Sequence, residues 1–259
     1  MPETAANGAT IHYEISGSPD GPWLVFSNSL GTDLRMWDAQ TAMFGRDFRI
    51  LRYDTRGHGQ SDAPSGDYSF DDLGRDALAV MDAAGVDEAY FCGLSMGGVT
   101  GMWLGVNAPE RFEKLVLCNT GAKIGDIETW QQRIDTVLST GMAPLVEPVV
   151  DRWFTRRFQD EQPAAVDRIR AMIKATPGAG YAGCCAALRD IDLRDAIAAI
   201  DLPTLVVAGR HDPSTPVANA EEIHAAIKGS RLVVLDAAHL SNIEQEAEFN
   251  ETVSTFLKA

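Results

Sequence analysis

Short apolar runs separated by amphipathic stretches organise most of the chain. Residues 11–15 alternate apolar and polar side chains, which is typical of an exposed strand, whereas 23–26 form a continuous apolar run suited to a strand buried on both faces. Further strands are predicted over 48–53, 88–92, 115–118, 205–208 and 232–235.

Helical stretches fill the gaps between these strands. Ser69 is positioned to cap a helix that stops at Gly85, and residues 99–108 and 246–258 predict two more. Residues 120–195 show only helical periodicity, broken by glycine and proline. Strands alternating with helices indicate the α/β class, with a mostly parallel twisted sheet flanked by helices. We therefore expect a core formed by residues 1–119 and 196–259, with 120–195 as an inserted helical cap over one edge of the sheet.

Composition narrows the function classes. The chain has 259 residues and a net charge of −15, which disfavours binding to nucleic acid or to anionic lipid. The N-terminal residues lack a basic segment followed by an apolar run, so neither secretion nor a membrane location is expected. The chain has four cysteines, two of them adjacent, which do not look like a disulfide framework and lack the C-x-x-C spacing of a zinc site. These features predict a cytoplasmic, reduced protein, and they leave the oligomeric state open.

The strongest chemical signal is Gly93-Leu94-Ser95-Met96-Gly97, which follows a predicted strand and opens a predicted helix. In a G-x-S-x-G elbow the serine stands on a sharp turn above the sheet, and small residues are needed on either side of it. The sequence therefore predicts that Ser95 is a nucleophile.

A serine nucleophile needs a histidine base, and the chain has five histidines. We expect His12 on the surface of a strand, His224 partly buried in a helix, and His58 in a structural loop. His211 precedes an aspartate, and His239 follows the last predicted strand. Sites in such sheets form at the carboxyl ends of strands, and a serine, acid, histidine chain order is typical of this motif. Both arguments favour His239 as the base.

The orienting acid should lie between these two residues in the chain. Asp212 directly follows the predicted strand 205–208, whereas the rival Asp236 would have to fold back onto a histidine three residues away. We therefore favour Asp212. A Ser95–Asp212–His239 triad needs neither a metal nor an organic cofactor, and we expect none.

This constellation resembles the α/β-hydrolase family across nearly the whole chain. The resemblance implies an oxyanion hole made by the backbone N–H groups of Met96 and Leu30. Most relatives carry His-Gly where this chain has Asn28-Ser29, and Leu30 then matches the donating position.

Four segments also resemble the 3-oxoadipate enol-lactonases: residues 28–37, 52–59, 118–125 and 183–190. The second is common to many hydrolases, and the others are more specific. The resemblance implies an acyl-enzyme hydrolysis of a small anionic lactone to 3-oxoadipate, in the β-ketoadipate pathway of bacterial aromatic catabolism. A generic carboxylesterase, a carbon–carbon-bond hydrolase, or a non-catalytic ligand-binding member of the fold are the alternatives.

An anionic substrate needs a local cation in a chain of this charge. Residues 120–195 carry ten basic and eleven acidic side chains, and arginine suits a carboxylate because its fork makes two hydrogen bonds. We predict that Arg133 binds the substrate carboxylate, with Trp130 and Trp153 as neighbouring substrate-binding residues. Arg152 is the alternative cation, and Trp130, Trp153 and Phe154 could instead fill the core of the cap. The adjacent Cys184 and Cys185 are expected to act as small apolar side chains.

Overall fold

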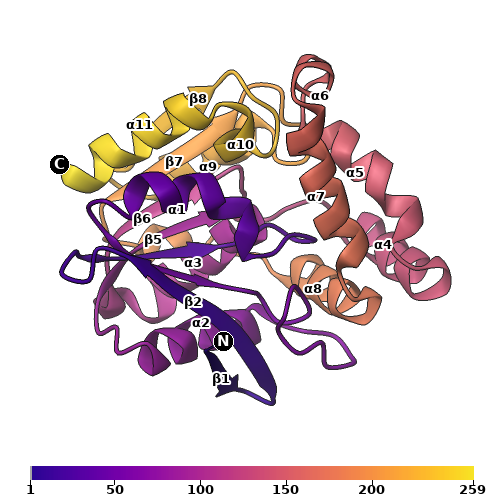
Figure 1. Ribbon diagram of the computed structural model, residues 1–259, viewed down its shortest axis with the longest axis horizontal. Helices are drawn as coiled ribbons and strands as arrows, with labels where there is room; N and C mark the ends of the chain where they lie inside the picture. The colour runs from indigo at the N-terminus through magenta and orange to yellow at the C-terminus, as the bar shows by residue number, and fades with distance from the viewer. Residues whose placement is uncertain (1) are drawn as a thin grey trace.

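The computed structural model describes residues 2–259, and a mostly parallel sheet runs through its centre (Figure 1). The strands are β1 (Glu3–Ala6), β2 (Ala9–Gly17), β3 (Trp23–Ser27), β4 (Arg49–Tyr53), β5 (Ala89–Leu94), β6 (Phe112–Cys118), β7 (Thr204–Gly209) and β8 (Arg231–Leu235). Their order across the sheet is β1-β2-β4-β3-β5-β6-β7-β8. β2 pairs antiparallel with β1 and β4, and the remaining pairs are parallel.

Helices cover both faces of this sheet. The α-helices are α1 (Asp38–Phe44), α2 (Phe70–Ala83), α3 (Met96–Asn107), α4 (Ile127–Thr140), α5 (Val146–Trp153), α6 (Arg156–Glu161), α7 (Pro163–Ala175), α8 (Gly178–Asp190), α9 (Val217–Ala226), α10 (Ser241–Glu244) and α11 (Glu246–Lys258). Short 3-10 turns are η1 (Leu34–Trp37), η2 (Pro109–Arg111), η3 (Ala143–Leu145) and η4 (Ile197–Ala199). Helices α1 and α11 lie together on one face, and α2 packs beside α3 on the other (Figure 1).

The predicted α/β class is confirmed, and several element ends match their sequence signals. Ser69 caps α2 in a capping box with Asp72, and Gly85 follows that helix with a φ of 71°. The third predicted helix, 246–258, coincides with α11. The parallel strands β3 to β7 are buried along most of their length, because helices cover both faces.

Helices α4 to α8 form a separate group at the side of the molecule opposite the C terminus; we call α4–α8 the helical insert (Figure 1). No strand occurs between β6 and β7. Arg189 and Arg168 of the insert pair with Asp67 and Asp38 outside it, at 3.0 and 2.9 Å. These ion pairs connect the insert to α1 and to the loop before α2. The division of the chain into a core and a cap over 120–195 stays a prediction.

Two histidine predictions were wrong. His12 is fully buried rather than on the surface, because β2 lies inside the sheet between β1 and β4. His224 is exposed rather than partly buried, because α9 turns Ala220 and Ile223 toward the sheet. Across residues 2–259, no helix has both the length and the apolar character needed to cross a bilayer.

Candidate active site

Ser95 stands at the sharp turn between β5 and α3. Its φ and ψ are 58° and −115°, one of only a few positive φ angles at non-glycine residues in the described chain. A Cβ atom on Gly93 would lie 2.1 Å from the carbonyl oxygen of Gly97, and one on Gly97 would lie 2.2 Å from that of Ser27. Both glycines are therefore required by close backbone contacts, and they allow the strained turn that raises Ser95 above the sheet.

Asp212 and His239 meet beside this turn, from the loops after β7 and β8. His239 Nδ1 lies 2.7 Å from Asp212 Oδ2, and both side chains are buried. The backbone N–H groups of Ser214 and Thr215 donate to Asp212 Oδ1 at 2.8 and 3.0 Å, and Thr215 Oγ1 donates to Oδ2 at 2.6 Å. Burial alone would raise the pKa of Asp212, but His239 and the Thr215 donors lower it below its ordinary value. The carboxylate is thus ionised and aimed at the imidazole.

The rival acid has a different partner. Asp236 Oδ1 lies 2.9 Å from Nε2 of His211, and both side chains are about half exposed. The structure therefore brings Asp212, and not Asp236, to His239. Ser95 and His239 line one cavity of about 270 Å³.

Two backbone N–H groups are available next to Ser95. Neither Leu30 N–H nor Met96 N–H has a hydrogen-bond partner among residues 2–259; Leu30 lines the cavity, and Met96 is the first residue of α3. A helix N-terminus favours negative charge. These are the two donors predicted for the oxyanion hole.

His58 holds the loop that carries Leu30. Its Nε2 accepts the N–H of Gly31 at 2.8 Å, and its Nδ1 faces the carbonyl oxygen of Arg56 at 3.2 Å. Burial lowers the pKa of His58 to about 4, so the ring is neutral at pH 7. A neutral ring with its proton on Nδ1 satisfies both contacts. The loop around His58, predicted to be structural, thus positions the backbone beside the candidate oxyanion hole.

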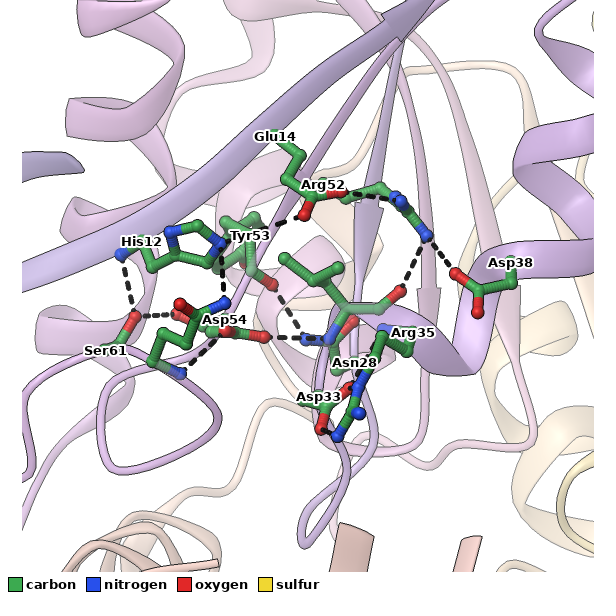
Figure 2. Close-up of polar contacts among 12 residues, drawn as sticks. His12, Glu14, Asn28, Asp33, Arg35, Asp38, Arg52, Tyr53, Asp54 and Ser61 are labelled. Atoms are coloured by element: carbon green, nitrogen blue, oxygen red, sulfur yellow. Dashed lines mark hydrogen bonds and ion pairs between the residues drawn. The ribbon is translucent and has the colours of Figure 1, made fainter. Parts of the chain in front are cut away.

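A polar network connects the same loop to β4 and to Asp54, the residue after it (Figure 2). Leu34 N–H donates to Asp54 Oδ1 at 2.8 Å, and the Leu34 carbonyl accepts from Arg52 at 3.2 Å. Asn28 Nδ2 donates to the Tyr53 carbonyl oxygen at 2.8 Å. The Asn28-Ser29 departure from the family pattern is therefore accommodated by a side-chain bond to β4.

The helical insert supplies the opposite wall of the cavity. Arg133 Cζ lies 4.9 Å from the ring centroid of Trp130, and Arg133 Nη1 lies 3.5 Å from Tyr181 Oη. Arg152 lines the same wall. Burial lowers the pKa of Arg152, and the positive charge of Arg133 lowers it further, so the two guanidinium groups feel each other's field.

Neither Arg133 nor Arg152 forms an ion pair within the described part of the chain. Six other basic residues between 120 and 195 do pair with carboxylates: Lys123, Arg156, Arg168, Arg170, Arg189 and Arg194. Unneutralised, partly buried cations sharing one cavity favour an anionic ligand. The predicted Arg133 and its alternative Arg152 are therefore brought to the same place.

The three aromatic residues left open by the sequence separate into two groups. Trp130 and Trp153 line the cavity, whereas Phe154 is buried and stacks on Phe158 with centroids 5.3 Å apart. Cys184 and Cys185 are buried free thiols, and burial raises the pKa of both. They are apolar packing residues, as predicted.

Sequence reasoning missed three residues that support this site. Asn119 contacts Asp212, Tyr181 contacts Arg133, and Glu244 accepts the backbone N–H of Ala238, next to His239, at 2.9 Å. Asn119 directly follows a predicted strand and lies within the segment 118–125 that resembles the enol-lactonases, and these were the available signals. The described residues contain no group of three or more histidine, cysteine or acidic side chains arranged to hold a metal.

Comparison with known proteins agrees with this geometry. Residues 22–246 match the family model for the alpha/beta hydrolase fold. The chain is 42% identical to 3-oxoadipate enol-lactonase 2 of Acinetobacter baylyi, covering 98% of this chain and 95% of that protein, and 40% identical to 3-oxoadipate enol-lactonase 1 of the same organism, covering 99% and 96%. The crystal structure of the enol-lactonase from Burkholderia xenovorans LB400 superposes with a TM-score of 0.98 at 44% identity, over the full length of both chains. The chain therefore belongs to the α/β-hydrolase family and groups within it with the 3-oxoadipate enol-lactonases.

Proposed function

We propose that this protein is a serine hydrolase that opens 3-oxoadipate enol-lactone to 3-oxoadipate. The observation that carries the proposal is one cavity with two chemically different walls. One wall holds Ser95, His239 and the Leu30 N–H, and the other holds the unpaired Arg133 and Arg152. Such a cavity suits a small ester that carries a separate carboxylate. The similarity of the chain to named enol-lactonases supports the same substrate.

The first half of the reaction acylates Ser95. His239 takes the hydroxyl proton as Ser95 Oγ attacks the lactone carbonyl carbon, and Asp212 stabilises the imidazolium that forms. The carbonyl oxygen becomes an oxyanion, which Leu30 N–H and Met96 N–H stabilise. When the intermediate collapses, the ring C–O bond breaks and the enolate leaves, protonated by His239. An enolate is a better leaving group than an alkoxide, so little assistance is required, and the enol then becomes the ketone.

The second half of the reaction hydrolyses the acyl-enzyme and releases the product, 3-oxoadipate. His239 removes a proton from water, and the resulting nucleophile attacks the acyl carbon of the ester on Ser95. The second tetrahedral intermediate uses the same oxyanion donors and expels Ser95, which regains its proton from His239. His239 carries the proton in both acyl-transfer steps, so we propose no metal or organic cofactor.

The substrate carboxylate is assigned to Arg133, with Arg152 beside it. A guanidinium fork binds a carboxylate through two hydrogen bonds, and the Arg133 guanidinium lies over the Trp130 ring, with Cζ 4.9 Å from the ring centroid. Two adjacent cations repel each other in the free protein, and a bound carboxylate relieves that repulsion. The local charge thus counteracts the −15 of the whole chain.

Residues 120–195 act in this proposal as a cap that closes the cavity over the triad, with 1–119 and 196–259 as the hydrolase core. The cavity volume of about 270 Å³ suits a small molecule rather than a polymer.

The four cysteines of the chain are buried free thiols, which suit a reducing compartment. We therefore infer a cytoplasmic location.

A direct assay tests the proposal. Purified protein is given 3-oxoadipate enol-lactone and, in parallel, p-nitrophenyl acetate, with Ser95→Ala as the matched control. We expect a much larger kcat/KM for the lactone, and none of this activity in the variant. Turnover of the ester alone would support a generic esterase instead, and turnover of neither would indicate a ligand-binding member of the fold.

A further inference from the structure

Asn119 occupies the junction between the loops that carry the acid and the base. It follows β6 directly, and its backbone N–H donates to the Val207 carbonyl oxygen of β7 at 2.7 Å. The side chain is buried, and Asn119 is not among the residues that line the cavity. It therefore cannot act by touching the substrate.

All three hydrogen-bonding positions that its amide uses point to the catalytic loops. Nδ2 donates to Asp212 Oδ2 and to the carbonyl oxygen of Ala238, both at 3.1 Å. Oδ1 accepts from the hydroxyl of Ser241 at 2.6 Å. The reverse orientation of the amide would set its oxygen against two acceptors, so the network itself determines which way the group faces.

A simpler role for Asn119 is that of a turn residue. Its φ of 44° lies in the left-handed region, which asparagine tolerates better than most side chains do. That role alone would leave the amide free to point anywhere. Here both amide hydrogens are used, one on the carboxylate that orients His239 and one on the residue preceding His239.

We propose that Asn119 is a positioning residue of the reaction, whose amide sets the distance between the acid loop and the histidine loop and holds Asp212 in the orientation that His239 requires. The inference rests on the proposed hydrolase function. Asp212 Oδ2 receives His239 Nδ1–H, the Thr215 hydroxyl and the Asn119 amide together. Without the amide, the carboxylate loses a donor, and the histidine loop loses its link to β6.

Asn119→Gly separates the two roles, because glycine adopts a positive φ without strain but has no amide side chain. We expect kcat on the lactone to fall about 10- to 100-fold, the loss typical of a hydrogen bond to a charged group, with KM unchanged. Asn7→Gly is the matched control: Asn7 has the same φ of 44°, lies in the exposed turn between β1 and β2, and is not among the residues that line the cavity. It should keep the kcat of the unmodified protein.

Asn119→Asp provides a readout that a merely structural residue would not change. The new carboxyl would face Asp212 Oδ2 at hydrogen-bond distance, and two such groups cannot both ionise easily. While it keeps its proton, its single O–H can donate to Asp212, although the Ala238 carbonyl loses its donor; once the proton is lost, the donor to Asp212 becomes a repelling charge. The other ionisable groups around this junction are His239, bonded to Asp212, and Glu244, bonded to Ala238 N–H. We therefore expect an added loss of kcat as pH rises, absent from the parent protein and from Asn119→Gly.

The assays of the parent protein and of these variants distinguish the failure of this inference from the failure of the proposed function. If the parent protein hydrolyses neither lactone nor ester, the proposed function fails. If the parent is active, a parent-like kcat in Asn119→Gly overturns the inference, and so does a parent-like pH profile in Asn119→Asp. Thermal unfolding confirms that each variant is folded; if the glycine variant is not, the near-isosteric aspartate variant decides the matter by its pH profile.

Discussion

The indole of Trp153 lies against the imidazole of His239, with ring centroids 5.7 Å apart and ring planes inclined by 32°. Trp153 ends α5 of the helical insert, and its carbonyl oxygen accepts the backbone N–H of Leu240 at 3.1 Å. The insert therefore contacts the proposed base through a side chain, and the residue that follows the base through the backbone. Glu244 adds a second connection, because it accepts the N–H groups of Ala238 and Thr155.

This contact predicts that Trp153 confines the imidazole as well as lining the cavity. Trp153→Ala should lower kcat/KM about tenfold, the order of an aromatic pair contact, whereas Trp153→Phe should retain most activity. Steady-state kinetics on the lactone measure both. Equal losses in the two variants would mean that the indole N–H, and not the ring face, matters.

The triad assignment predicts a clear difference between two aspartates. The substitution Asp212→Asn should lower kcat by several orders of magnitude, because the imidazole would no longer be held in the required tautomer. Asp236→Asn removes only an exposed pair with His211 and should be nearly silent. Ser95→Ala and His239→Ala should be as severe as Asp212→Asn while leaving the fold intact. A reversed order of the two aspartate variants would show that Asp236 is the acid.

The anion site predicts a dependence on substrate charge. Arg133→Ala should cost about 1.5–3 kcal/mol in kcat/KM for the anionic lactone and almost nothing for p-nitrophenyl acetate. The control is Arg156→Ala, which removes an exposed arginine paired with Asp160. Parallel losses on both substrates would assign Arg133 to the structure of the insert instead.

His58 predicts a pH dependence of stability. Its pKa is about 4 when folded, below the 6.5 of an exposed histidine, so between these values the unfolded chain binds more protons than the folded one. The free energy of unfolding should therefore fall as pH drops from 6.5 to 4, by up to about 3 kcal/mol from this group. Urea unfolding at several pH values measures the effect. Subtracting the profile of His58→Gln isolates it, and identical slopes in the two proteins would contradict it.

The proposed mechanism also predicts insensitivity to chelators. Ser95, His239 and Asp212 supply nucleophile, base and orientation, so dialysis against a chelator should leave kcat unchanged. Loss of activity that a divalent ion restores would require a different mechanism.

The sequence alone was sufficient wherever one segment held the whole signal. The G-x-S-x-G spacing lies within a single strand–turn–helix unit, and the contact that requires Gly93 is internal to that unit, whereas Gly97 is required by a contact with Ser27 of β3. Asp212 and His239 each follow a strand whose apolar run can be read directly. Local chemistry also placed the Ser69 cap of α2 and the limits of α11.

Tertiary structure decided what depends on segments far apart in the chain. His12 became buried because β2 pairs on both sides, and Asn119 reached Asp212, 93 residues away, because β6 and β7 are neighbours in the sheet. Arg133 and Arg152 look like their paired neighbours in sequence, and only the packing of the insert leaves these two facing the cavity without a carboxylate. Periodicity reports which face of an element is apolar. Partners across the fold follow from how those faces pack, which no local pattern encodes.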